Sequence, residues 1–314
     1  MSGLHVNADT FARAETDRMF TALAADAGGV NHLNHARTPT PLNHQPVIRM
    51  NRDTLYSSAV VDISEGATLT LPSTDGRYLS AMVVNRDHYI NGVLHDPGTH
   101  ELTTDRYDTD YVLVAIRTLV DPADPDDVAA VNALQDRISL TAVASRAFTP
   151  PDHDGASLDR TRAALLELAK GYGEFDRAFG ARADVDPVRH LVGTAAGWGG
   201  LPSAEATYVN VDPGLPVGKY EITVRDVPVD GFWSISLYNA EGYFDDDGST
   251  VSVNNLTAQR DADGAVTVHF GGCGDGRPNC LSVKDGWNYL VRLYRPRPEI
   301  LDGSWTFPAV TPVG

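Results

Sequence analysis

The sequence has 314 residues, 42% of them hydrophobic and 21% charged, which is typical of a globular chain of about two domains and excludes collagen, coiled coils and disulfide-rich mini-proteins. It carries 25 lysines and arginines against 42 aspartates and glutamates, a formal net charge of −17. Phosphate backbones and anionic lipids repel such a chain, so nucleic acids and membranes are poor partner candidates. A small molecule is the expected partner, and a homo-oligomer is possible.

The N-terminus lacks the pattern of an export signal. Asp9, Glu15 and Asp17 occupy a region where a signal peptide needs a basic start and an apolar stretch. No apolar run reaches the roughly 18 residues of a membrane span. We therefore expect a cytoplasmic protein.

Helical and strand patterns follow one another in blocks along the chain. Residues 9–26 place apolar side chains at helical spacing. Strand patterns separated by turn residues follow at 55–63, 67–71, 78–84 and 111–120. Helical patterns return at 126–138, at 157–179 behind a possible Ser157 cap, and after Asp186-Pro187. Strands resume at 220–224, 232–238, 265–270 and 289–294.

This order predicts a mainly β, α+β fold with helical insertions, in which a helical connector joins two β-modules. We expect an N-terminal β-rich domain with a leading helix at 1–123, the connector at 124–204 and a C-terminal β-sandwich domain at 205–314.

The motifs of several common enzyme classes are absent. The sequence contains no G-x-S-x-G nucleophile elbow, no H-E-x-x-H, no P-loop and no G-x-G-x-x-G between a strand and a helix. The glycine-rich run 197–202 follows a helix and ends in proline, so it predicts a tight loop around Trp198, a candidate ligand contact.

A repeated phrase carries the strongest candidate chemistry. Asn51-Arg52-Asp53-Thr54-Leu55-Tyr56 and Asn85-Arg86-Asp87-His88-Tyr89 each adjoin an apolar strand. Arginine can hold a carboxylate in a two-pronged hydrogen bond, and histidine beside acids can act as a base near neutral pH. An Arg–Asp network that only ties strand ends together is the competing interpretation.

Two aromatic-rich strands in the C-terminal region suggest a ligand cavity. Alternation places Ser234, Ser236 and Tyr238 on one face of the first strand, and Asn288, Arg292 and Tyr294 on one face of the second. A β-sandwich or barrel lined in this way could hold a small organic ligand, with Trp233, Tyr238 and Arg292 as contacts. For Trp233, Trp287 and Leu293, a place in the core is the favoured interpretation.

Metal binding is a weaker alternative. His32 and His35 have a spacing that suits a metal, and His88 and His95 could join them. No cofactor is predicted, although a divalent metal is possible. Cys273 and Cys280 lie in a glycine-rich loop, where two free thiols are the favoured interpretation over a disulfide because the cytosol is reducing.

Five phrases together resemble a known family: residues 47–56, 75–89, 227–244, 271–281 and 286–307. The sequence is similar to proteins that pair the domain of unknown function 1254 with the domain of unknown function 1214. The resemblance implies a β-rich N-terminal domain and a C-terminal sandwich or jelly-roll-like domain with helices packed between them. It implies no reaction and transfers no catalytic residue.

The leading hypothesis is a hydrolase of an ester, lactone or amide bond, with its pocket between the two β-modules. His88 would be the base, Asp53 or Asp87 would orient it, Arg52 or Arg86 would hold an anionic group, and Tyr56 or Tyr238 would donate a hydrogen bond. Asn51 is a further substrate contact. The alternatives are a non-catalytic binding protein for an aromatic or terpenoid molecule and a metal-dependent enzyme.

Overall fold

The computed structural model describes residues 3–313, whose contacts form two compact units. The first unit takes the residues up to Arg37, Leu55–Leu119 and Ala129–Ser203. The second takes Thr38–Thr54, Val120–Val128 and the residues from Ala204 onward. The domain boundaries expected from the sequence stay a prediction, but most of the expected connector groups with the first unit.

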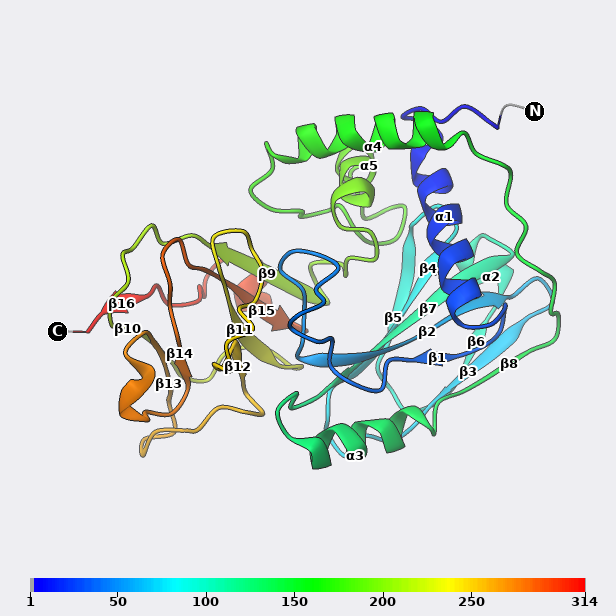
Figure 1. Cartoon of the computed structure of the whole chain (residues 1–314). Helices are drawn as coiled ribbons and strands as arrows, with labels where there is room; N and C mark the ends of the chain where they lie inside the picture. Colours follow the sequence, from blue (N-terminus) through cyan, green and yellow to red (C-terminus); the bar gives the residue numbers. More distant parts are fainter. Residues whose placement is uncertain (1–2, 314) are drawn as a thin grey trace. The chain divides into compact units, whose positions relative to one another are not determined.

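Two sheets form the β-part of the first unit (Figure 1). The larger has the order β1 (Asn34–His35), β2 (Thr54–Asp62), β7 (Tyr111–Leu119), β4 (Leu79–Asn85) and β5 (Ile90–Leu94). The smaller has the order β6 (Gly98–Leu102), β3 (Ala67–Leu71) and β8 (Ser139–Ala142). Apolar side chains from both sheets share one core, to which β3 contributes every second residue. The four strands expected here are confirmed.

Three helices of the first unit pack against one another: α1 (Phe11–Asp26), α4 (Gly155–Ala169) and α5 (Pro187–Ala196). The helix expected at 157–179 is too long, because α4 ends just before two glycines, Gly171 and Gly173. Its cap is Asp154, which accepts a hydrogen bond from the Ser157 amide, and not Ser157 itself. Asp186 caps α5 as expected.

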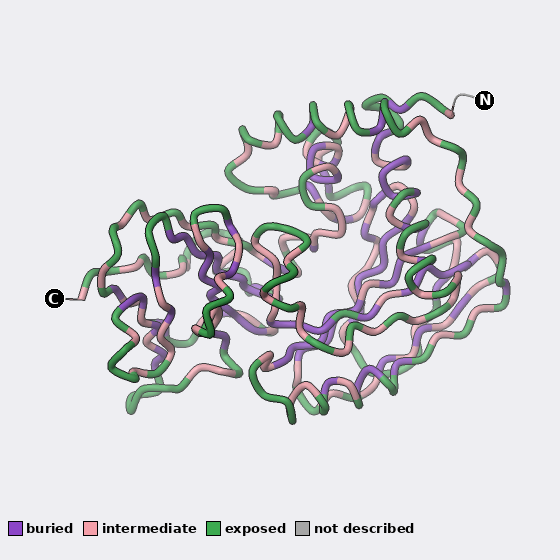
Figure 2. Tube along the Cα trace, in the orientation of Figure 1, coloured by how far each residue is buried: buried purple, intermediate pink, exposed green. Residues whose placement is uncertain are grey.

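The second unit is a β-sandwich. One sheet has the order β12 (Ser252–Asn254), β11 (Trp233–Tyr238), β15 (Asn288–Tyr294) and β9 (Ala206–Val211). The other has the order β14 (Cys280–Leu281), β13 (Val266–Phe270), β10 (Tyr220–Val224) and β16 (Thr311–Pro312). Trp233, Trp287 and Leu293 lie in the core between them, as expected. Figure 2 shows the buried residues concentrated along the strands of each unit.

The remaining elements are the helix α3 (Pro125–Gln135), the short helices α2 (Thr104–Tyr107) and α6 (Pro298–Leu301), and a 3-10 turn at Cys273–Asp275. Among the described residues, no helix is long and apolar enough to cross a bilayer. The mixed α+β fold that the sequence predicts is confirmed, and the described residues form four sheets.

Candidate functional site

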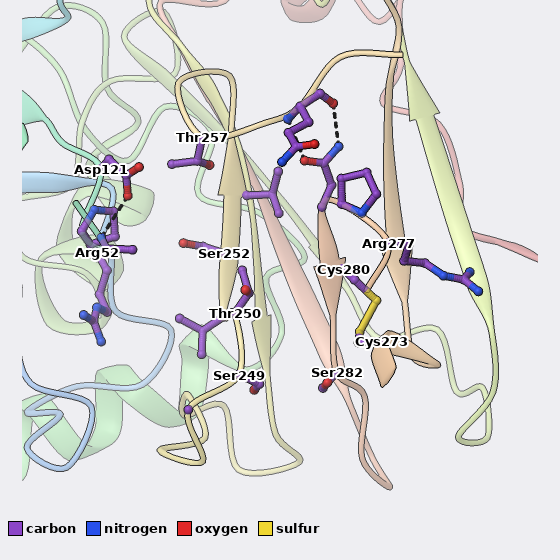
Figure 3. A pocket seen from close by; sticks show the side chains of 18 of the residues that line it. Arg52, Asp121, Ser249, Thr250, Ser252, Thr257, Cys273, Arg277, Cys280 and Ser282 are labelled. Carbon is purple, nitrogen blue, oxygen red and sulfur yellow. Dashed lines mark hydrogen bonds between the residues drawn. A yellow bond between two sulfur atoms is a disulfide. The ribbon is translucent and has the colours of Figure 1, made fainter. Parts of the chain in front are cut away.

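A pocket of about 770 Å³ opens in the second unit beside two edge strands, β12 and β14 (Figure 3). Its walls come from stretches far apart in the sequence. They are Leu42, Arg52, residues 121–123, residues 248–253, Thr257, Gln259, Cys273, residues 276–280 and Ser282. No aromatic side chain is among them, and five carry a hydroxyl group. The pocket therefore suits a polar ligand better than an aromatic one.

Three charged side chains line this pocket: Arg52, Asp121 and Arg277. Arg277 forms an ion pair with Asp275, and one Asp121 oxygen accepts a hydrogen bond from the Ala123 amide at 2.9 Å. In the view of Figure 3, the Asp121 carboxylate and the Arg52 guanidinium group lie apart, and no hydrogen bond is drawn between them. Arg52 is consequently the cation most available to a ligand.

Arg52 is poorly satisfied by the protein itself. Its Nε atom is buried and has no hydrogen-bond partner among the described residues. Burial lowers the pKa of Arg52, although Asp246 and Asp53 act in the opposite direction, and an arginine stays protonated at neutral pH. A buried N–H without an acceptor is costly, so an acceptor supplied by a ligand would be stabilising.

The residues on either side of Arg52 are held firmly. The Asn51 side chain donates to the Tyr294 hydroxyl at 3.0 Å and accepts from the Asp53 amide at 2.8 Å. Asp53 is fully buried, and its Oδ1 atom accepts from Asn254 Nδ2 at 3.1 Å. These contacts fix the backbone on both sides of Arg52 and so preorganise the cation at the pocket wall.

Arg292 holds the backbone just before Asn51 in place through hydrogen bonds. Its Nη2 atom donates to the Arg49 and Met50 carbonyls, at 2.8 and 3.1 Å, and to the Tyr238 hydroxyl at 2.8 Å. Its Nη1 atom lies 4.0 Å from Asp53 Oδ2. The side-chain faces expected for β11 and β15 are confirmed by the register, which sets Ser234 opposite Arg292.

Tyr238 and Arg292 are thus buried in a polar network, and Trp233 is buried in the core. None of the three lines the pocket beside β12 and β14. That these residues contact a ligand stays a prediction; in the structure their side chains contact other residues of the chain.

His88, expected as the base, is fully buried in the first unit. Its Nε2 atom accepts a hydrogen bond from the Gly199 amide at 2.9 Å, so Nδ1 carries the proton that bonds to Thr194 Oγ1 at 2.8 Å. Burial, with a smaller effect from His190, lowers the pKa of His88 to about 3. The ring is therefore neutral at pH 7 and oriented by Thr194, in place of the expected Asp53 or Asp87.

The acids and arginines around His88 also have partners of their own. Asp87 forms an ion pair with Arg13, and Arg86 with the buried Asp17, each at 2.5 Å. Trp198 Nε1 donates to Thr16 Oγ1 at 3.1 Å, and its ring stacks on His88. The tight loop expected around Trp198 fits these contacts.

Tyr56 also belongs to the first unit, where its ring lies 5.5 Å from the Arg117 guanidinium carbon. The predicted catalytic set is accordingly divided. Asn51, Arg52 and Asp53 belong to the second unit, and Tyr56, Arg86, Asp87, His88 and Trp198 to the first.

The repeated phrase has a conformational explanation. Asn51 Oδ1 accepts from the Asp53 amide at 2.8 Å, and Asn85 Oδ1 accepts from the Asp87 amide at 2.9 Å. An asparagine that bonds to the amide two residues later forms an Asx turn. The repetition thus marks two similar turns beside strands.

The histidines considered for metal binding have separate contacts. His35 Nδ1 lies 2.7 Å from Ser57 Oγ, and His95 Nδ1 lies 3.1 Å from the Leu79 carbonyl. Within residues 3–313, no group of three or more His, Cys, Asp or Glu side chains is arranged to hold a metal ion.

Cys273 and Cys280 form a disulfide with a Cα–Cα distance of 5.6 Å. The expectation of two free thiols is wrong. Their Cα distance suits a disulfide. Free thiols were expected only because the sequence suggested a cytoplasmic protein in a reducing environment. The cytoplasmic location stays a prediction, and the bridge counts against it because disulfides persist in oxidising compartments.

Sequence reasoning missed most of the pocket, including Asp121 and Ser252. Their stretches are a Pro-rich loop and a short edge strand, and neither has a periodic pattern or a known motif. Arg52 had a signal in the repeated phrase, and Cys273 and Cys280 had one as a cysteine pair in a glycine-rich loop.

Comparison with solved structures confirms the fold. The VPA0106 protein from Vibrio parahaemolyticus matches with a TM-score of 0.73 and 18% sequence identity, over 97% of each chain. An uncharacterised protein from Burkholderia cenocepacia matches with a TM-score of 0.54 and 17% identity, over 96% of this chain and 87% of the other. A search among curated proteins finds no match.

Two family models match the sequence, both described as protein of unknown function. DUF1254 covers residues 30–142, and DUF1214 covers residues 215–298. The resemblance noted in the sequence is confirmed, and the chain belongs to the proteins that pair a DUF1254 domain with a DUF1214 domain.

Proposed function

We propose that the chain binds a small hydroxylated anion, such as a sugar acid, in the pocket beside β12 and β14. The observation that carries this proposal is the buried, unpartnered Nε atom of Arg52 at the wall of the pocket. A ligand carboxylate would pair with the guanidinium group that carries this N–H and neutralise its charge.

The rest of the pocket supports a ligand rich in hydroxyl groups. Ser252, Thr250 and Ser282 line it, and each hydroxyl can both donate and accept a hydrogen bond. Because no aromatic side chain lines this pocket, an aromatic or terpenoid ligand has less support here. The net charge of −17 disfavours large polyanions but leaves a local cation able to hold one carboxylate.

Isothermal titration with D-gluconate and with sorbitol, its neutral analogue, tests the proposal. We expect gluconate to bind more tightly than sorbitol, because only gluconate offers a carboxylate to Arg52. Arg52→Ala should weaken gluconate binding by about 10- to 100-fold, the worth of one charge-assisted hydrogen bond.

Arg225→Ala is the matched control. Arg225 is half-exposed in the same unit and forms an ion pair with Asp263, so its removal changes the net charge equally without altering the pocket. It should leave gluconate affinity unchanged. Gluconate that fails to bind, or binds equally well to Arg52→Ala, would contradict the proposal.

Hydrolysis of an ester, lactone or amide bond is a second candidate, favoured by Asp121 in the same pocket. A carboxylate can take a proton from water, and Arg52 could stabilise the oxyanion. His88 has both ring nitrogens engaged, so we assign the base to Asp121 in this proposal.

The hydrolase is tested by the rate of lactone and ester hydrolysis above background. Asp121→Asn keeps the shape of the side chain and should lower turnover about 100-fold or more. His88→Gln should leave kcat unchanged in protein that remains folded. Turnover that survives Asp121→Asn would remove this candidate.

A further inference from the structure

The Cys273–Cys280 bridge is part of the pocket wall. Both cysteines line the pocket, together with residues 276–279 of the loop that they enclose. Figure 3 shows the bridge on the side of the pocket away from Arg52. Both cysteines are partly exposed, so a reductant in solution can reach them.

The two ends of the bridge differ in how they are held. Cys280 lies on β14, which pairs with β13 through bonds from the His269 amide to the Asn279 carbonyl and from the Gly271 amide to the Leu281 carbonyl, at 2.9 and 2.7 Å. Cys280 is therefore fixed to the sandwich.

The residues between the cysteines are held differently. Among the described residues, the hydrogen bonds of residues 273–278 stay within this stretch, as between the Gly276 amide and the Cys273 carbonyl and between Arg277 and Asp275. Gly272 and Gly276 have positive φ angles and add no side-chain packing. Beyond the peptide chain, which continues from Pro278 into β14, the disulfide is thus the cross-link that holds the Cys273 end of this stretch to β14.

We propose that this disulfide is a redox control of ligand binding in the pocket. With the bridge closed, residues 273–278 form a fixed wall. A dithiol reductant gives two electrons and two protons to the bridge, so the S–S bond breaks, two thiols form and the reductant closes its own disulfide. The loop then keeps its peptide connection to β14 but loses the cross-link at Cys273, and the ligand must order it again on binding.

This inference rests on the proposed function, and one titration separates the two. Gluconate is titrated into the oxidised protein and into protein reduced with dithiothreitol, with two thiols per chain confirmed by a thiol assay. We expect reduction to weaken binding at least tenfold and reoxidation to restore it. Equal affinity in both forms would overturn the redox control alone, and no binding in either form would overturn the proposed function.

Hydrogen exchange gives a second measurement that needs no ligand. Reduction should speed exchange of the amides in residues 273–277 while β11 and β15 stay protected. The double variant Cys273→Ser/Cys280→Ser should bind gluconate as weakly as the reduced protein, and its affinity should not change when the reductant is added. Unchanged exchange in the loop, or loss of protection throughout the second unit, would overturn the proposal.

Discussion

Asn51-Arg52-Asp53 in the second unit and Asn85-Arg86-Asp87 in the first share the same residues and the same Asx turn. In the first unit both charges are neutralised by ion pairs, Arg86 with Asp17 and Asp87 with Arg13. In the second, Arg52 keeps an unpartnered buried N–H and lines a pocket. The same turn therefore places one arginine in an ion pair and the other, with an unpartnered N–H, at the wall of a pocket, and the surroundings decide which.

The largest expected effect is a pH dependence of the free energy of unfolding, which follows from the burial of His88 in the first unit. Its pKa of about 3 in the folded protein lies below the unfolded value of 6.5. Between these pH values the unfolded chain binds the extra proton, so the free energy of unfolding falls as the pH falls, by about 1.4 kcal/mol per unit and about 5 kcal/mol in all.

Urea unfolding at pH 7 and pH 5 measures this effect. The wild type should lose about 2 kcal/mol more than His88→Gln over this range, because only the wild type has this imidazole to protonate. Equal pH dependence of the two proteins would show that His88 is not kept neutral by folding.

The second effect concerns the support beneath Arg52. Arg292→Met removes a buried charge and leaves Asp53, 4.0 Å away, without its nearest cation. We expect a loss of about 3–5 kcal/mol in the free energy of unfolding, measured by urea denaturation. A loss below about 1 kcal/mol would mean that the network does not hold this segment in place.

The two asparagines offer a matched pair. Asn51→Ala and Asn85→Ala each remove an Asx turn, and each should cost about 1 kcal/mol of stability. Asn51→Ala should also weaken gluconate binding, because Arg52 loses its support, whereas Asn85→Ala should not. Equal effects of the two variants on gluconate binding would contradict the claim that only the Asn51 turn supports the pocket.

The smallest effect on stability is expected for Arg52 itself. Arg52→Ala removes a poorly satisfied cation, so its free energy of unfolding should stay within about 0.5 kcal/mol of the wild type despite the loss of binding. A large loss of stability in the same urea experiment would show that Arg52, like Arg86, stabilises the fold.

The strands were predictable where alternation or long apolar runs mark a buried face, as in β3 and β4. The short strands β12 and β14 were not, because two or three residues carry no period. The sequence could identify Arg52 but not its partners, since Asn254 and Arg292 are brought to this segment by the sandwich. The surroundings of His88 could not be predicted, because Asp87 precedes it in sequence whereas its hydrogen-bond partners in space are Thr194 and Gly199.

The discontinuous make-up of the second unit has a consequence for folding. Arg292 donates to the Arg49 carbonyl across 243 positions of sequence, so the segment carrying Arg52 gains this anchor only after β15 has been synthesised. Contacts between residues so far apart in sequence slow folding, and during translation residues 38–54 lack these partners until β15 has been made. A fragment that begins at residue 204 would lack residues 38–54 and would expose the polar face of β11 and β15.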